Sequence, residues 1–202
     1  MNLKTTTSRF ALLAPALLLS LNGCITVATT AATETAVVVA QERSVGNAVD
    51  DVGVLAQIKH LYIQKDVNDL FANVLIKVIE GRVLLTGNVD RVETQVDAVR
   101  LAWRVNGVRE VINEIQINDK TDFVNYAKDV WISTQISGRL LITKDIRSVN
   151  YSTIVVNQEA LVMGIAQDRF ELDRVFNVIA SVSGITKVTS YARIKTDPNR
   201  PN

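Results

Sequence analysis

Few residues in this 202-residue chain have a type and spacing that could support covalent or metal chemistry. Cys24 is the single cysteine and has no partner for an intramolecular disulfide, and the single histidine, His60, excludes a multi-histidine metal site. Ser133, His60 and Asp129 provide the residue types of a catalytic triad, but no serine lies in a nucleophile-elbow sequence. We therefore predict no catalytic residue, no metal, no cofactor and a non-enzymatic protein.

Composition and charge restrict the classes of partner. The chain is 48% hydrophobic and 21% charged, which is enough apolar material for a packed core. Its 22 basic and 21 acidic residues leave a formal net charge of +1. This balance provides no basic field for nucleic acid, so we predict no nucleic-acid partner. An affinity for anionic lipid would have to come from a local patch.

The first residues have the pattern of an export signal. Lys4 and Arg9 precede an apolar run over residues 10–21, which is too short to span a bilayer and is typical of a secretory signal peptide. The run ends in Leu21-Asn22-Gly23-Cys24, which looks like a lipoprotein processing site. Cleavage before Cys24 would free its amine, and its thiol would carry a diacylglycerol. The alternative is an ordinary signal peptide with an incidental cysteine.

The residues after the cysteine suggest a destination and a tether. Ile25 stands where many lipoproteins of the inner membrane carry aspartate, and this resemblance implies lipid anchoring in the outer membrane, facing the periplasm. Residues 24–48 are rich in Ala, Thr and Val, and we interpret them as a lipidated tether. The run Val37–Val39 could instead begin a strand or a helix.

An internal repeat determines the predicted architecture. Positions that recur 77 or 78 residues later are Asp51 and Asp129, Ile58 and Ile136, Gly87 and Gly164, Gly107 and Gly184, and Val111 and Val188. We predict a signal peptide at 1–23, a tether at 24–48, one module at 49–119, a second at 124–196, and a disordered tail at 197–202.

Each copy has the periodicity of helix, strand, strand, helix and strand. The first helix of copy one has Val54, Ile58 and Tyr62 at a spacing of four. Glu80-Gly81 predicts a hairpin turn, which corresponds to Asn157-Gln158 in copy two. The fold class is therefore α+β, with two tandem αββαβ modules, each a three-stranded mixed sheet covered by two helices.

Three smaller predictions concern individual positions. Asp50-Asp51 are interpreted as residues that cap the start of the first helix. Trp103 continues the spacing of Val92, Val96 and Val99, and we expect it to be buried. The second helix is expected to carry an apolar stripe of Ala98, Val99, Ala102 and Val105, matched in copy two by Val175, Phe176, Ile179 and Val182.

This pattern resembles the BON domain, a periplasmic module named for bacterial osmotic-stress and nodulation proteins. The residues that carry the resemblance are Asp51, Val54, Ile58, Gly81–Val89 and Gly107–Val111 in copy one, and Asp129–Ile136, Leu161–Gly164 and Gly184–Val188 in copy two. A lipoprotein signal before two BON copies is similar to dual-BON outer-membrane lipoproteins. The resemblance implies a non-enzymatic, phospholipid-binding protein that supports envelope integrity.

The first helix of copy two is the candidate lipid-binding element. Trp131 lies about 100° from the core stripe, and its counterpart in copy one is Gly53. Tryptophan favours the membrane interface, basic groups can contact lipid phosphates, and small residues let a headgroup approach. The predicted lipid-binding residues are Lys128, Trp131, Gln135, Ser137, Gly138, Arg139 and Lys144. The alternative is that Trp131 packs against the other domain.

Two classes of partner follow from these features. The first is anionic phospholipid, such as phosphatidylglycerol or cardiolipin, contacted by a protein that its lipid anchor holds at the membrane. The alternative is a scaffold or adaptor that uses the same helix, or an exposed sheet edge, to bind an outer-membrane assembly or a cell-division complex.

Overall fold

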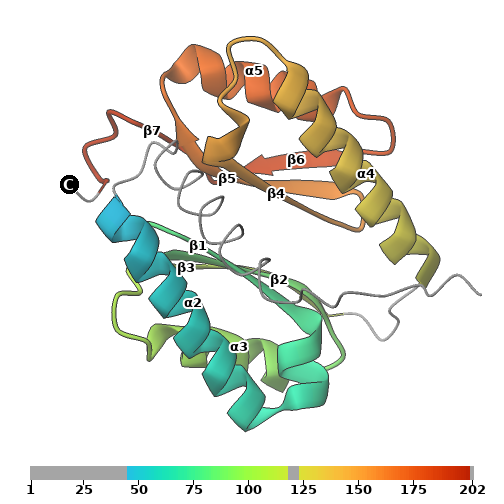
Figure 1. Cartoon of the computed structure of the whole chain (residues 1–202). Coiled ribbons are helices and arrows are strands. Elements are labelled where there is room, and N and C mark those ends of the chain that lie inside the picture. The colour runs from blue at the N-terminus through green and yellow to red at the C-terminus, as the bar shows by residue number, and fades with distance from the viewer. Residues whose placement is uncertain (1–44, 118–122, 201–202) are drawn as a thin grey trace, which may run out of the picture.

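The computed structural model describes residues 45–117 and 123–200 and shows four layers (Figure 1). Helices α2 and α3 form one outer layer, α4 and α5 form the other, and two sheets lie back to back between them. The predicted signal peptide and most of the predicted tether, including Cys24, lie outside the described residues.

Each module has the predicted order of elements. In the first module the elements are α2 (Val45–Lys65), the π-helical turn η1 (Val67–Phe71), β1 (Val74–Ile79), β2 (Arg82–Val89), α3 (Val92–Trp103) and β3 (Glu110–Ile117). In the second they are α4 (Phe123–Ile142), the 3-10 turn η2 (Ser148–Asn150), β4 (Tyr151–Val156), β5 (Glu159–Ala166), α5 (Arg169–Ala180), β6 (Lys187–Ser190) and β7 (Arg193–Ile194). The predicted α+β class with two αββαβ modules is confirmed.

The two sheets share one topology. In each, the central strand pairs antiparallel with the preceding strand and parallel with the following one. The second sheet has a fourth short strand, β7, which also pairs parallel with β5. The register of the parallel pairs is the same throughout, because the residue numbers of paired residues always differ by the same amount. Examples are Arg82 with Glu110 across β2 and β3, Glu159 with Lys187 across β5 and β6, and Ile165 with Arg193 across β5 and β7. Strands β6 and β7 are therefore one strand interrupted at Tyr191-Ala192.

Each module has its own core between its helices and its sheet. In the first module the buried side chains include Val54, Ile58 and Tyr62, as predicted. In the second module Ile132, Ile136 and Leu140 occupy the equivalent places on α4. The helical repeat pattern therefore located both cores correctly.

The prediction that Trp103 is buried is wrong, and one member of the predicted stripe on the second helix of copy two also lies outside the core. Helix α3 carries two apolar stripes, and the one that faces the sheet contains Ala98, Leu101 and Ala102, whose two alanines allow close approach. The stripe that contains Trp103 faces outward. On α5, Val175 and Ile179 face the sheet, and Phe176 lies one residue off that stripe and is exposed.

The predicted capping role of Asp51 is also wrong, because α2 already begins at Val45 and Asp51 lies almost two turns further on. The predicted boundary between tether and module at residue 48 therefore falls inside a helix. The Asp51 carboxylate is buried and accepts hydrogen bonds from the backbone N–H groups of Glu80 and Gly81, both at 2.8 Å. These are the two residues of the predicted hairpin turn, and both have positive φ.

The second module repeats this contact. Asp129 accepts hydrogen bonds from the N–H groups of Asn157 and Gln158 at 2.7 and 2.9 Å. Both residues have positive φ without being glycine, which asparagine tolerates better than most residues. In each module, one buried carboxylate therefore joins the first helix to the hairpin turn.

The two modules pack through the sheet faces that the helices leave open. Leu84 of β2 and Leu161 and Met163 of β5 form a buried apolar cluster at this contact. At its rim, the hydroxyl of Tyr191 donates to the carboxylate of Glu114, and Arg82 donates to the carbonyl of Tyr191 at 2.7 Å. The back-to-back packing explains why β2 and β5 are buried on both faces.

The C-terminal segment fastens the second module to the first. Arg200 makes a bidentate contact with Glu80 at 2.6 and 3.1 Å, and both side chains are largely buried. Arg193 contacts Glu110 at 3.1 Å, and Arg82 contacts the same carboxylate at 2.6 Å. Residues 197–200, which were predicted to belong to a disordered tail, are therefore ordered in turns. We call this group the C-terminal clasp: Glu80, Arg82, Glu110, Arg193 and Arg200.

Removing the Asp51 carboxylate tests the junction between α2 and the hairpin turn. Asp51→Ala leaves two N–H groups without their acceptor, and we expect a loss of about 2 to 4 kcal/mol in the free energy of unfolding. Urea denaturation followed by circular dichroism measures this loss. The matched control is Asp50→Ala at the exposed neighbouring position, where the change should be small. Equal losses in the two variants would contradict the assigned role.

A second prediction concerns the pH dependence of the clasp. The hydrogen bond from Arg82 holds the pKa of Glu110 below its ordinary value of 4.5. A depressed carboxyl pKa stabilises the folded state above the ordinary value, and this contribution is lost as pH falls through the folded pKa. The difference in unfolding free energy between wild type and Glu110→Gln should therefore be largest near pH 7 and shrink below about pH 4.5. A difference that stays constant from pH 7 to pH 3 would rule out this ionic contribution.

Candidate functional site

Helix α4 covers the outer face of the second sheet, and its setting determines which residues face away from the protein. Asp129, Ile132 and Ile136 are directed inward by the contacts already described. Trp131 is consequently directed outward and is 64% exposed. The alternative prediction that Trp131 packs against the other domain is therefore wrong.

The outward residues of α4 form one continuous face. Trp131, Gln135, Gly138 and Ile142 follow one another at intervals of four, three and four residues, which places them on a single stripe of a helix. Lys128 and Arg139 lie about 60° and 80° to one side of Trp131 at 100° per residue. We call these six residues the outer face of α4.

The two basic side chains of this face make hydrogen bonds within the protein and still have N–H donors left for another partner. The ammonium group of Lys128 donates to Oε1 of Gln158 at 2.7 Å. The guanidinium group of Arg139 donates to the hydroxyl of Ser181 at 3.1 Å and to its carbonyl at 3.3 Å. An ammonium group has three donors and a guanidinium group has five, so both can still bind an anion.

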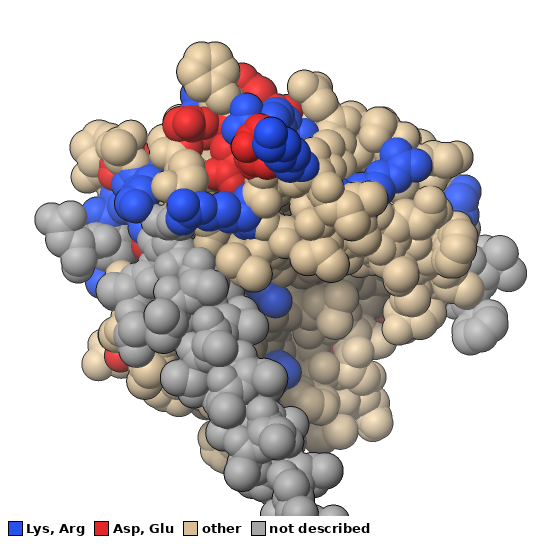
Figure 2. Space-filling view, turned by 45° about the horizontal axis from the view of Figure 1, so that its top comes forward, with Lys and Arg blue, Asp and Glu red and all other residues tan. Residues whose placement is uncertain are grey.

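No acidic side chain competes with these cations on the helix. The one carboxylate within α4 belongs to Asp129, which is buried at the opposite side and occupied by the hairpin turn. In Figure 2 the acidic side chains of this view gather mostly in one mixed cluster, and the broad surface beside it is mainly uncharged with separate basic groups. The outer face of α4 can therefore accept an anionic and partly apolar surface.

The remaining predicted residues lie differently. Ser137 is 120° from Trp131 and donates its hydroxyl to the carbonyl of Ser133 at 3.0 Å, so it does not belong to this face. Gly138 does belong to it, and a Cβ atom there would meet no atom within 4 Å. Lys144 lies beyond the end of α4 and is exposed.

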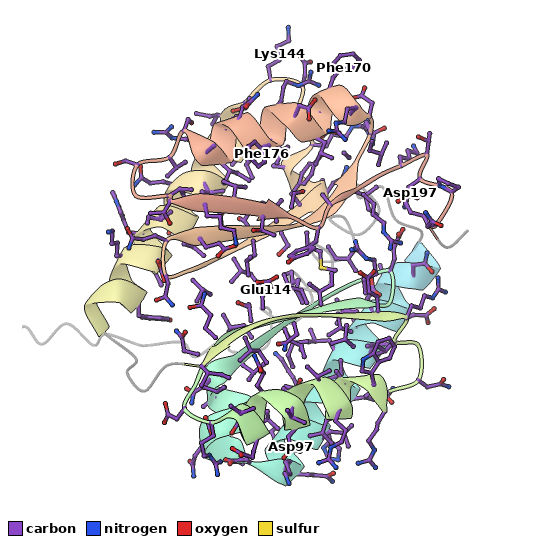
Figure 3. The ribbon with its side chains drawn as sticks, turned by 180° about the vertical axis from the view of Figure 1, so that it is seen from behind. Asp97, Glu114, Lys144, Phe170, Phe176 and Asp197 are labelled. Carbon is purple, nitrogen blue, oxygen red and sulfur yellow. The ribbon has the colours of Figure 1, made fainter. Side chains whose placement is uncertain are left out.

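Sequence reasoning missed the apolar end of this surface. Ile142 is 82% exposed, and Leu141 beside it is also exposed. Phe170, at the start of α5, is exposed and lies at the same outer end of the module as Lys144 (Figure 3). The signal was present in the run Leu140–Ile142, because a helix with one buried face cannot bury three consecutive apolar residues.

The equivalent helix of the first module exposes Val49, Val52 and Ile63, but it does not repeat the residue types of the outer face of α4 at the matching positions. The residues of α2 that correspond to Lys128, Trp131, Gly138, Arg139 and Ile142 are Asp50, Gly53, His60, Leu61 and Gln64. Two basic positions become acidic or apolar, and both large exposed apolar positions are lost. The combination of an exposed tryptophan with these two basic side chains therefore distinguishes α4 from α2.

Two further observations bear on other classes of function. Within residues 45–117 and 123–200, no group of three or more histidine, cysteine, aspartate or glutamate residues could hold a metal ion. None of the helices described in these ranges has the length and hydropathy needed to cross a membrane.

Two copies of one αββαβ module, joined back to back, define a class of two-domain proteins with a repeated small α+β fold. The family model described as BON domain matches residues 50–119 and 128–196. The chain belongs to the BON-domain family and carries two copies of the domain.

Relatives extend this assignment. The chain is 38% identical over 148 residues to the "uncharacterized protein in gshII 5'region" of Anaplasma centrale, covering 73% of this chain and 96% of that protein. It is 26% identical over 170 residues to the outer membrane lipoprotein DolP of Haemophilus influenzae, covering 83% and 86%. It is 29% identical over 147 residues to the 21 kDa hemolysin of Actinobacillus pleuropneumoniae, covering 72% and 75%. The predicted resemblance to dual-BON, DolP-like proteins is confirmed.

Solved structures add little. The type III secretion protein CdsD of Chlamydia trachomatis matches at a TM-score of 0.29 and 17% identity, over 69% of this chain and 62% of that structure. Its C-terminal domain matches at a TM-score of 0.30 and 13% identity, over 69% and 95%. Scores this low support no argument about fold or function.

A substitution at Gly138 tests the open space on the outer face. Glycine inside a helix costs about 0.5 to 1 kcal/mol relative to alanine, and no neighbouring atom obstructs a Cβ here. Gly138→Ala should therefore raise the free energy of unfolding by about that amount, measured by urea denaturation. Gly164→Ala is the opposing control, because its Cβ would lie 2.4 Å from the carbonyl oxygen of Asn150 and should destabilise the protein. A loss of stability in Gly138→Ala would contradict the open geometry.

Proposed function

We propose that this chain is an envelope-associated lipoprotein that binds anionic phospholipid through the outer face of α4, without catalysing a reaction. One observation carries the proposal: exposed Trp131 and Ile142 lie beside Lys128 and Arg139 on a helix whose single carboxylate is buried. Two such apolar side chains are costly in water unless another surface covers them.

The chemistry of this face fits the boundary between headgroups and acyl chains. Tryptophan has an apolar ring body and a polar N–H, and it favours this boundary. Lys128 and Arg139 are separated by about 16 Å along the helix axis at 1.5 Å per residue, so they would contact different headgroups. Each basic group near an anionic surface contributes about 1 kcal/mol.

The anchor at Cys24 completes the proposal. The relative DolP is named an outer membrane lipoprotein, which supports the interpretation of Leu21–Cys24 as a lipidation site. Ile25 after the cysteine favours the inner leaflet of the outer membrane, with the two BON domains in the periplasm. An anchored protein meets the same membrane at high effective concentration, so a weak contact through α4 suffices. Phosphatidylglycerol and cardiolipin are the proposed lipids, and support of envelope integrity is the proposed role.

Co-sedimentation with vesicles tests the lipid contact without the anchor. The test protein is residues 25–202, which retains both cores and lacks Cys24. We expect binding to vesicles of phosphatidylcholine with phosphatidylglycerol or cardiolipin, and little binding to phosphatidylcholine alone. Trp131→Glu should reduce the affinity at least tenfold, and Lys128→Gln about fivefold, in line with about 1 kcal/mol per basic group.

The matched control is Val52→Glu on α2. Val52 is 65% exposed, which equals the exposure of Trp131 within one per cent, but it lies on the first module. This variant should bind as wild type does. Loss of binding in Val52→Glu equal to that in Trp131→Glu would show a general charge effect and reject the α4 face. No binding by the wild type to any of the vesicles would reject lipid binding and favour a protein partner.

A further inference from the structure

Helix α3 carries a second exposed apolar surface, on the opposite outer layer from α4 (Figure 1). Val92, Val96 and Trp103 are 54%, 56% and 52% exposed, and Val99 between them is half-buried. None of the residues in the described ranges covers this stripe. Half-exposed tryptophan and valine in one row, rather than scattered, mark a contact surface. We call Val92, Val96, Val99 and Trp103 the α3 stripe.

The spacing of the α3 stripe is symmetric. Its members are separated by four, three and four residues, so the series is the same when it is followed from either end. An antiparallel second copy of α3 would therefore place Val92 against the partner's Trp103 and Val96 against the partner's Val99. The two tryptophans then lie at opposite ends of the contact, each against a valine, and valines face one another at its centre, where the helices can approach closely.

The charges beside the stripe are complementary in the same arrangement. Glu93 and Arg100 each follow a stripe residue by one position, so they lie on the same flank. In an antiparallel pair these flanks face each other, which brings Glu93 of each copy to the partner's Arg100, twice by symmetry. A parallel pair would instead bring this flank against Gln95 and Ala102 and form no ion pair.

Both charged side chains are available for this contact. Glu93 is exposed and has no ion-pair partner within the described residues. Arg100 contacts Asp97 at 2.5 Å, but Asp97 also pairs with Lys65 at 3.1 Å and would keep that partner if Arg100 turned away. Asp97 lies on the outward side of α3, at the edge of the molecule (Figure 3).

We propose that the α3 stripe is a self-association surface on which a second copy of this chain docks antiparallel, with Glu93 and Arg100 paired across a twofold axis. The helix is 12 residues, about 18 Å, so the contact lies at the small end of specific interfaces and the dimer exchanges readily. The proposal is independent of lipid binding, because α4 lies on the other outer layer.

Sedimentation velocity of residues 25–202 over a wide concentration range tests the proposal. The wild type should pass from monomer to dimer as concentration rises. Glu93→Arg and Arg100→Glu should each weaken the dimer at least tenfold, because each places like charges opposite one another. The double variant Glu93→Arg with Arg100→Glu should return to within about threefold of wild type, since the pairs are restored with reversed sign.

Two controls separate this surface from others. Trp103→Glu should abolish the dimer, whereas Trp131→Glu on α4 should leave it unchanged; both tryptophans are exposed, so both variants should keep the wild-type thermal midpoint. A wild type that stays monomeric at every concentration would overturn the proposal. Charge reversals that weaken the dimer without rescue in the double variant would overturn the antiparallel arrangement, and so would a dimer sensitive to Trp131 and not to Trp103.

Discussion

A buried carboxylate in the first helix of each module determines how that helix sits on its sheet. Asp51 and Asp129 each accept the two N–H groups of a hairpin turn whose residues both have left-handed backbone conformation. Such a turn leaves these donors pointing out of the sheet, and a buried donor without an acceptor is costly. The carboxylate satisfies both and thereby fixes the rotation of the helix about its axis. The outward direction of Trp131, two residues after Asp129, follows from this constraint.

The back-to-back packing of the sheets leaves the helices of both modules on the outside of the molecule. Because the apolar cluster of Leu84, Leu161 and Met163 occupies the space between the sheets, both pairs of helices remain in outer layers. Duplicated modules could then diverge on their helices without disturbing the contact that joins them. The α4 face and the α3 stripe are consistent with such divergence. Gly53 stands on α2 where α4 has Trp131, and Arg169, Asp173, Phe176 and Ala180 stand on α5 where α3 has its stripe.

Much of the fold could be predicted from periodicity and turn chemistry. Val54, Ile58 and Tyr62 at a spacing of four, and glycine at residue 81 of a two-residue turn, specify local structure that the tertiary contacts do not override. Trp103 could not be placed, because α3 has two apolar stripes and the sequence does not show that the alanine-containing one faces the sheet. The packing of Leu84 against the second sheet, and the clasp through Arg200, depend on contacts between residues far apart in the chain. On α4, the offset of Trp131 by about 100° from the core stripe indicated its exposure, but the offset of Ser137 by 120° from Trp131 was overlooked.

The C-terminal clasp also determines the path of mechanical load through the molecule. The predicted tether precedes α2 of the first module in the sequence, whereas the outer face of α4 belongs to the second module. A force between the N-terminal side of α2 and a surface bound to α4 is therefore carried by the contact between the two sheets as well as by the peptide connection from β3 to α4. The Arg200 and Glu80 pair lies at that contact, and it joins the last described residue of the chain to the same hairpin turn that Asp51 holds. Besides the apolar cluster between the sheets, the Asp51 and Arg200 contacts give tension applied to α2 a short polar route to the second module, so the molecule should resist shear as one body.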